Sequence, residues 1–262
     1  MKNFVFFFFL VLLLPNRESS SEVTFTYIGN MGVLIQQHEK SILIDGLHEY
    51  YGDEYSYPNA NLLQKINEQY QPHTLLFTHS HGDHFSVGQA NTYLKDHENT
   101  LVSGPAQVTD MLDVPNAVKI TIATDNYQKQ RFKRPGFLIT AFRMDHAGGR
   151  HTKRQNIAFI INTGDIKILH VGDSNWRVQK DLFETNAIKK EAIDVAILPH
   201  WMLADQTAKD FIQNYLPDTQ LIATHISPKV QDDLLRSLQE KFPKLIIFNQ
   251  LEQQTKLSKQ KE

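Results

Sequence analysis

The chain has 262 residues, and its 27 Lys and Arg nearly balance its 29 Asp and Glu to a formal charge of -2, which argues against extended nucleic-acid binding through a basic surface. With 41% hydrophobic and 21% charged residues, the composition is that of a globular protein with a sizeable core, and it excludes disorder and collagen-like repeats. The absence of cysteine excludes disulfides, iron–sulfur clusters and thiolate metal ligands, so any metal must be held by carboxylates and the 12 histidines.

The first residues have the pattern of an export signal. Lys2 precedes an apolar run over residues 4–14, and serines follow at 19–21. This run of 11 residues falls short of the roughly 20 that span a bilayer as a helix, so no stable membrane span is expected. We predict a signal peptide over residues 1–21, a mature domain over 22–262, and export to the periplasm or the extracellular space. An uncleaved anchor is the alternative, because the usual Ala-x-Ala cleavage pattern is missing.

Hydrophobic periodicity divides the rest of the chain into short strands and helices. A strand meander is expected over residues 23–28, 33–37 and 41–44. Next we expect a helix over 59–70, a strand over 75–77, a helix over 86–96, and strands near 100–103, 117–122 and 137–143. After a hairpin over 156–163 and 166–171, helices near 178–190, 207–215 and 228–240 alternate with strands 193–198, 220–224 and 244–248. This order predicts an α/β fold in one domain, with sheets at the centre and helices outside.

The strand over 75–77 leads into a turn in which three imidazoles and a carboxylate follow the pattern HxHxDH. These residues are His79, His81, Asp83 and His84. A turn that leaves a strand end directs alternate side chains to one side, so His79 and His81 can converge on one metal while Asp83 and His84 reach a second. Imidazole and carboxylate suit Zn²⁺ most simply, and iron and manganese accept similar ligands. The alternative is a polar loop without metal.

HxHxDH at the end of a buried strand resembles the metallo-β-lactamase superfamily, whose members fold as a four-layer αββα sandwich with one or two metals along one edge. The resemblance covers about residues 23–250 and implies three further ligands, each near a strand end: His146, Asp173 and His225. His151 competes with His146, but it lies in a basic loop where a solvated role is expected. Asp165 competes with Asp173, but it lies in a hairpin turn, where Asp commonly bonds to the backbone.

Two earlier segments also resemble the superfamily. Ile42-Leu43-Ile44-Asp45-Gly46 is similar to an early motif whose Asp orients the metal-binding loop without binding the metal itself. The segment over 27–35 resembles the opening strands of a subset that includes ascorbate-6-phosphate lactonase and the N-acyl-phosphatidylethanolamine phospholipases. In that subset a His commonly follows the first Gly, whereas this chain has Asn30.

The resemblance implies a metallo-hydrolase with two Zn²⁺ ions that acts on a small-molecule lactone, ester, amide or phosphodiester. A hydroxide bridging the metals would be the nucleophile, Asp173 the bridging ligand, and Asp83 a source of the leaving-group proton. The main alternative is a mononuclear iron dioxygenase of the same superfamily, and a noncatalytic zinc-binding module is another. A diiron centre is disfavoured, because Ser80 stands where that type has an acid.

Several segments are candidates for the pocket wall. The segment over 50–57 contains four tyrosines and either covers substrate or packs as a surface loop. His200 and its neighbours Trp201 and Met202 either line the pocket or belong to the core. A solvated turn is expected for Arg150, Lys153 and Arg154 rather than an anion site. The other histidines have structural interpretations, namely His38, His73, His97 and His170, and the sequence leaves the oligomeric state open.

Overall fold

The structure is a computed structural model that describes residues 22–115, 118–230 and 232–259, without the side chains of residues 177–180. The predicted signal peptide, residues 1–21, lies outside the described residues. Within the described ranges, no helix combines the length and the apolar character that crossing a membrane requires.

The first of two sheets has seven strands in the order β14-β1-β2-β3-β4-β5-β6. Strands β14, β1, β2 and β3 pair antiparallel, and β3 to β6 pair parallel. The strands are β1 (Val23–Gly29), β2 (Gly32–Gln37), β3 (Lys40–Ile44), β4 (Thr74–Leu76), β5 (Leu101–Pro105), β6 (Lys119–Ile122) and β14 (Gln254–Leu257).

The second sheet also has seven strands, in the order β13-β12-β11-β10-β9-β8-β7. Strands β7 to β10 pair antiparallel, and β10 to β13 pair parallel. The strands are β7 (Gln130–Arg134), β8 (Phe137–Arg143), β9 (Ile157–Asn162), β10 (Lys167–His170), β11 (Val195–Pro199), β12 (Gln220–Thr224) and β13 (Ile246–Ile247).

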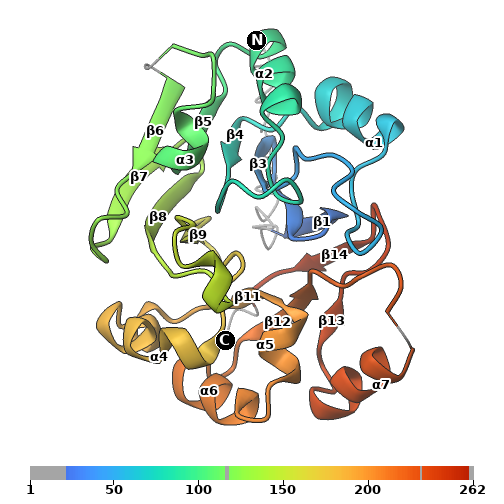
Figure 1. The fold of residues 1–262 in the computed structure, drawn as a ribbon, viewed down its shortest axis with the longest axis vertical. Helices are drawn as coiled ribbons and strands as arrows, with labels where there is room; N and C mark the ends of the chain where they lie inside the picture. The colour runs from blue at the N-terminus through green and yellow to red at the C-terminus, as the bar shows by residue number, and fades with distance from the viewer. Residues whose placement is uncertain (1–21, 116–117, 231, 260–262) are drawn as a thin grey trace, which may run out of the picture.

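Helices cover the outer face of each sheet, and Figure 1 shows the two groups at opposite ends of the view. The first sheet carries α1 (Ala60–Lys65), the π-helix η1 (Ile66–Tyr70), α2 (Val87–Asp96) and α3 (Ala106–Thr109). The second sheet carries α4 (Trp176–Thr185), η4 (Ile188–Glu191), α5 (His200–Ala204), α6 (Ala208–Tyr215) and α7 (Asp232–Lys241). The 3-10 turn η3 (Gly149–His151) lies between β8 and β9. The expected α/β fold, a four-layer αββα sandwich, is confirmed.

Strand periodicity explains the layers, because successive side chains of a strand point to opposite faces of its sheet. In β2, Val33 and Ile35 belong to the core between the sheets, whereas Leu34 packs under the helices of the first sheet. In β3, Ile42 and Ile44 face inward and Leu43 faces the helices. These central strands of the first sheet are therefore buried on both faces.

Two strands were not expected from the sequence, β7 and β14. Both lie at sheet edges and are mostly polar, with Phe132 in β7 and Leu257 in β14 packing partly buried against the central core. The expected helix over 59–70 also divides into α1 and η1, and the one over 178–190 into α4 and η4. These differences leave the layer order unchanged.

Candidate metal centre

The HxHxDH turn follows β4 and is held by the carboxylate of Asp45 at the end of β3. Asp45 accepts hydrogen bonds from Thr78 N at 2.7 Å, Thr78 Oγ1 at 2.6 Å and His84 Nδ1 at 2.9 Å. His84 N and Phe85 N also donate to His81 O, which closes the turn. Asp45 therefore orients the loop from behind, as the early motif implies.

The first ligand group consists of His79, His81, His146 and Asp173, whose candidate ligand atoms lie within 4.8 Å of one another. His81 Nδ1 lies 3.0 Å from His79 Nε2 and 3.2 Å from His146 Nε2. Asp173 Oδ2 lies 3.6 Å from His146 Nε2 and 4.0 Å from His79 Nε2. Three imidazoles and a carboxylate thus surround one point.

The second group consists of Asp83, His84, Asp173 and His225, again within 4.8 Å. His225 Nε2 lies 3.4 Å from both Asp83 Oδ2 and Asp173 Oδ2, and His84 Nε2 lies 3.2 Å from Asp173 Oδ1. Asp173 belongs to both groups. The structure therefore brings all seven sequence-predicted residues together at one edge of the sandwich, from both sheets.

Asp173 is positioned by Gly172 and Asn156. Gly172 has a left-handed φ of 59°, and a Cβ there would lie 2.3 Å from Asn156 Oδ1, so the position requires glycine. Asn156 accepts from Asp173 N and donates to the carbonyls of Met144 and Val171, which ties the ends of β8 and β10 together.

His225 follows β12 in a left-handed conformation, with φ 56°. Its backbone N donates to Asn30 O at 2.8 Å, and its carbonyl accepts from His200 Nδ1 at 2.6 Å. His200 therefore supports the backbone of His225 and does not line the pocket. The left-handed Asn30 also contacts the second group with its side chain, a contact that sequence reasoning missed.

Hydrogen bonds set the tautomers of three imidazoles. His84 Nδ1 donates to Asp45, and His146 Nδ1 donates to Ala147 O at 2.6 Å. Because Thr78 Oγ1 donates to Asp45, it accepts from His79 Nδ1 at 3.0 Å. The Nε2 atoms of His79 and His146 are then left with lone pairs directed at the first group, as in metal-binding histidines, and His84 Nε2 faces the second group.

Burial favours neutral imidazoles in the first group. It lowers the pKa of His79 and of His146 from the ordinary value, and it lowers that of His81 to about 4. Neutral imidazole is the form that binds a metal.

Ion pairing dominates the second group. Burial lowers the pKa of His225, but the carboxylates of Asp173 and Asp83 outweigh it and raise this pKa to about 9. For Asp173, burial raises the pKa, but His84 and His225 outweigh it and hold it well below the ordinary range. Burial also lowers the pKa of His84, but the same two carboxylates outweigh it and hold this pKa well above its ordinary value. A cation binding here must therefore displace protons from both His84 and His225.

The donor set fits divalent cations. Asp173 Oδ1 and His225 Nε2 are buried without a hydrogen bond of regular geometry to any described residue, although buried polar atoms are normally satisfied. The close imidazole nitrogens of the first group carry lone pairs that a shared cation satisfies. Two cations would thus bind atoms for which the described residues offer no regular hydrogen bond.

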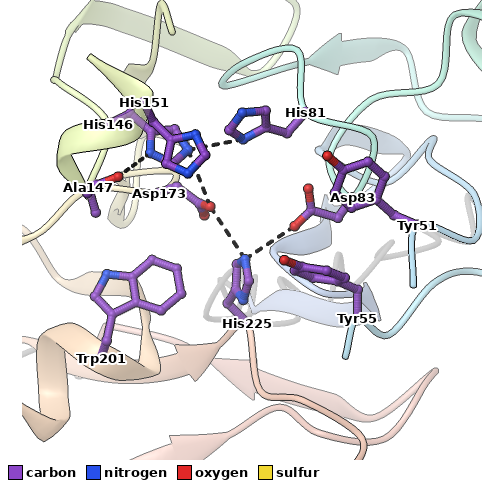
Figure 2. Close-up of a pocket in the computed structure, with 11 residues that line it drawn as sticks. Tyr51, Tyr55, His81, Asp83, His146, Ala147, His151, Asp173, Trp201 and His225 are labelled. Carbon is purple, nitrogen blue, oxygen red and sulfur yellow. Dashed lines mark hydrogen bonds and ion pairs between the residues drawn. The ribbon is translucent and has the colours of Figure 1, made fainter. Parts of the chain in front are cut away.

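A cavity of about 350 Å³ opens over both groups (Figure 2). Its walls include Tyr51, Tyr55, Trp201 and His151 beside five of the ligands. The His151 ring lies 4.9 Å from that of His81 and 4.8 Å from that of His146, so His151 faces the pocket instead of the solvated position expected for it. The sequence signal that could have placed His151 at the pocket was its short separation from His146.

The remaining candidates lie outside the cavity wall. Arg150, Lys153 and Arg154 do not line it, and Arg154 donates to Ser80 Oγ at 3.0 Å. Asp165 stays in the β9–β10 turn, where it accepts from Gln37 Nε2 at 2.7 Å. His73, His97 and His170 contact Ser41, Asn67 and Met31 O, respectively.

Fold and site together define a metal-dependent enzyme of the metallo-hydrolase class, built on an αββα sandwich. A family model described as a β-lactamase superfamily domain matches residues 24–214, and the chain belongs to this superfamily, as the sequence resemblance indicated. The matched segment contains every proposed ligand except His225. Comparison with curated proteins gives no match.

Solved structures share the fold at low sequence identity. A possible metal-dependent hydrolase from Veillonella parvula has 12% identity and a TM-score of 0.65, covering 90% of this chain and 99% of that one. The metallo hydrolase Igni18 from Ignicoccus hospitalis has 15% identity and a TM-score of 0.61, covering 92% and 100%. CmlA, a diiron β-hydroxylase from Streptomyces venezuelae, has 14% identity and a TM-score of 0.57, covering 91% of this chain and 54% of that one.

Proposed function

We propose that this protein hydrolyses a small-molecule lactone, ester, amide or phosphodiester at a centre of two divalent cations, most simply Zn²⁺. The observation that carries the proposal is the shared position of Asp173. Its carboxylate lies within 4.0 Å of His79 and 3.6 Å of His146 in the first group, and 3.2 Å of His84 and 3.4 Å of His225 in the second. Two bound cations supply a hydroxide nucleophile at neutral pH and polarise the substrate oxygen.

The side chains of the site have separate roles. His79, His81 and His146 would hold one cation, Asp83, His84 and His225 would hold the other, and Asp173 would contribute to both. Burial raises the pKa of Asp83, but His84 and His225 outweigh it and keep this pKa below its ordinary value. Asp83 is thus ionised at rest, so it first accepts the proton released from water and then passes it to the leaving group.

The rival function is a mononuclear iron dioxygenase. A one-metal site would need only one ligand group, whereas this chain has a second complete group that shares Asp173. Elemental analysis separates the two functions, because two zinc equivalents support hydrolysis and one iron supports the oxygenase. Two manganese or iron ions would keep the hydrolase and change only the metal.

Export of the protein is part of the proposal. It is supported by the short apolar run over 4–14 after Lys2 and by the serines that follow. Mass spectrometry of the protein recovered outside the cytoplasm is expected to show a mature chain that begins near residue 22. A full-length chain in that fraction would instead support an uncleaved anchor.

The decisive variants are His81→Ala and Asp173→Ala. Both are expected to abolish turnover against a panel of lactone, β-lactam, thioester, amide and phosphodiester substrates, and to lower the bound metal measured by elemental analysis. Asp165→Ala is the matched control, because Asp165 also follows a glycine but lies in the β9–β10 turn. Full activity in the His81 or Asp173 variant would reject the assignment.

A further inference from the structure

The cavity over the ligand groups has an aromatic wall that the hydrolytic chemistry does not use. Tyr51 and Tyr55 lie on one side of His225, and Trp201 lies on the other (Figure 2). The ring of Tyr55 is 5.7 Å from that of His225, and the ring of Trp201 is 4.6 Å from it, both edge to face. These three rings flank the place where a substrate must lie.

The tyrosine side of the wall is fixed in place by packing. Tyr51 lies so close over Gly82 that a Cβ there would be 2.4 Å from Tyr51 Cδ2. The following residues hold the segment to the loop after β12, because Glu54 accepts from Ser227 Oγ at 3.0 Å and Lys229 lies 3.3 Å from Glu54. These contacts hold the tyrosine segment beside the cavity.

Trp201 presents an apolar surface to the cavity. Its indole N–H donates to Ser174 O at 2.8 Å, so its single polar group already has a partner. The ring is left to make stacking and apolar contacts.

Among the described side chains of the cavity wall there is no lysine or arginine, and the two carboxylates, Asp83 and Asp173, are proposed metal ligands. Two basic side chains beside the site have other partners, since Arg154 donates to Ser80 and Lys229 pairs with Asp53 and Glu54. Among the described side chains, the part of the substrate beyond the reacting group therefore meets aromatic rings and no lysine or arginine.

We infer that the substrate is an uncharged carbonyl compound with an aromatic group next to the bond that is cleaved, and that Tyr51, Tyr55 and Trp201 bind this group. The inference rests on the proposed function and narrows its substrate class to aryl lactones, esters or amides. In a lactone, the oxygen of water bonds to the carbonyl carbon and the ring C–O bond breaks. The proton passes to the leaving oxygen, and the product is a hydroxy acid.

A binding experiment tests the aromatic site without turnover. Saturation-transfer difference NMR on the metal-loaded protein would use three ketones that are not hydrolysed, namely phenylacetone, butanone and 4-carboxyphenylacetone. We expect saturation of the phenyl protons of phenylacetone, and a signal at least about fivefold weaker for the other two. Tyr51→Ala and Trp201→Ala are expected to remove the phenyl signal. Met111→Ala is the control, because Met111 is as exposed as Tyr51, at 52%, and lies outside the cavity wall.

A kinetic experiment tests the same inference in the reaction. Hydrolysis of dihydrocoumarin, δ-valerolactone and a carboxylated dihydrocoumarin would be followed by proton release. We expect kcat/KM for dihydrocoumarin to exceed the other two values at least about tenfold. Tyr51→Ala is expected to raise its KM while bound metal stays at the wild-type level.

The outcomes separate the proposed hydrolase function from the inferred aromatic substrate class. Phenylacetone binding that depends on Tyr51 and Trp201, without hydrolysis of any lactone, ester, amide or phosphodiester, would overturn the proposed function and keep the aromatic site. Hydrolysis of phosphodiesters alone would overturn the inferred substrate class and keep the hydrolase. Hydrolysis of all three lactones at equal kcat/KM, or preferential binding of the carboxylated ketone, would overturn the inferred substrate class and keep the hydrolase. Absence of both phenylacetone binding and lactone, ester or amide hydrolysis would overturn the inference.

Discussion

Asn30 contacts all three residues that are unique to the second ligand group. Its side-chain Nδ2 donates to Asp83 Oδ2 at 2.9 Å and to Asp83 O at 3.1 Å, and it lies 3.3 Å from His84 Nε2. Its carbonyl accepts from His225 N. The left-handed φ of 48° that permits both sets of contacts is one that asparagine tolerates. Asn30 is thus a positioning residue for the second cation.

Asn30→Ala is expected to weaken binding of the second metal equivalent by about 10–100-fold, because partners that orient metal ligands have effects of this size. Binding of the first equivalent should be unchanged. A metal titration against a competing chelator measures both constants. Asn59→Ala is the control, since Asn59 caps α1 by accepting from Leu62 N. Two wild-type binding constants in the Asn30 variant would contradict this role.

Gly172 and Gly149 allow a matched comparison of Gly→Ala substitutions, one at a constrained backbone position and one at an open position. Gly172→Ala is expected to destabilise the fold by at least about 1–2 kcal/mol, since its left-handed φ disfavours a side chain and a Cβ would press on Asn156 and Thr78. It should also lower metal content by displacing Asp173. At Gly149 a Cβ would meet nothing within 4 Å. Equal denaturant stability of the two variants would disprove the argument.

At the scale of elements, the sequence predicts the buried strands well and the edge strands poorly. β1, β2 and β3 are alternating or continuous apolar runs, so their residues identify them directly. β7 and β14 are recognised only through pairing with β8 and β1, because edge strands exposed on one side need few apolar residues. Their own residues do not identify these strands, because what defines them is tertiary pairing with a neighbouring strand.

The short helix η4 is joined to the second sheet by Glu191. This carboxylate lies 2.5 Å from Lys129 and 3.8 Å from Lys167. Burial raises the pKa of Glu191, but the two lysines outweigh it and lower this pKa below the ordinary value of 4.5. The stabilisation is therefore present above that value and is lost as the pH falls through the lower, folded-state pKa.

The Glu191→Gln variant tests whether ionised Glu191 stabilises the folded state. The difference in unfolding free energy between wild type and variant should be largest near pH 7 and should shrink as the solution is acidified below about pH 4.5. Denaturant titrations at several pH values measure it. A difference that grows on acidification would show that Glu191 is not stabilised as the anion.

At the scale of the whole molecule, the site joins the two sheets. The HxHxDH turn belongs to the first sheet, while His146, Asp173 and His225 follow strands of the second. Strand-end positions and family order were enough to predict these seven residues. The tyrosine segment and Trp201 were candidates for the pocket wall, but the sequence left their position open, because Tyr51 and His151 reach the cavity only through packing on Gly82 and the turn after His146.

Metal removal is therefore expected to loosen the sandwich. A ligand that binds only the folded state at about 100 times its Kd adds about 2.7 kcal/mol, so chelation should lower the Tm measurably. The same chelator should shift the Tm of Asp173→Ala much less. An unchanged wild-type Tm after verified metal removal would show that the cations do not join the sheets.

Anomalous X-ray diffraction from crystals of the metal-loaded protein tests the central claim most directly. We predict two peaks, one among His79, His81, His146 and Asp173, and one among Asp83, His84, Asp173 and His225. A crystal with full metal content but no peak between these side chains, or with peaks elsewhere, would contradict the account.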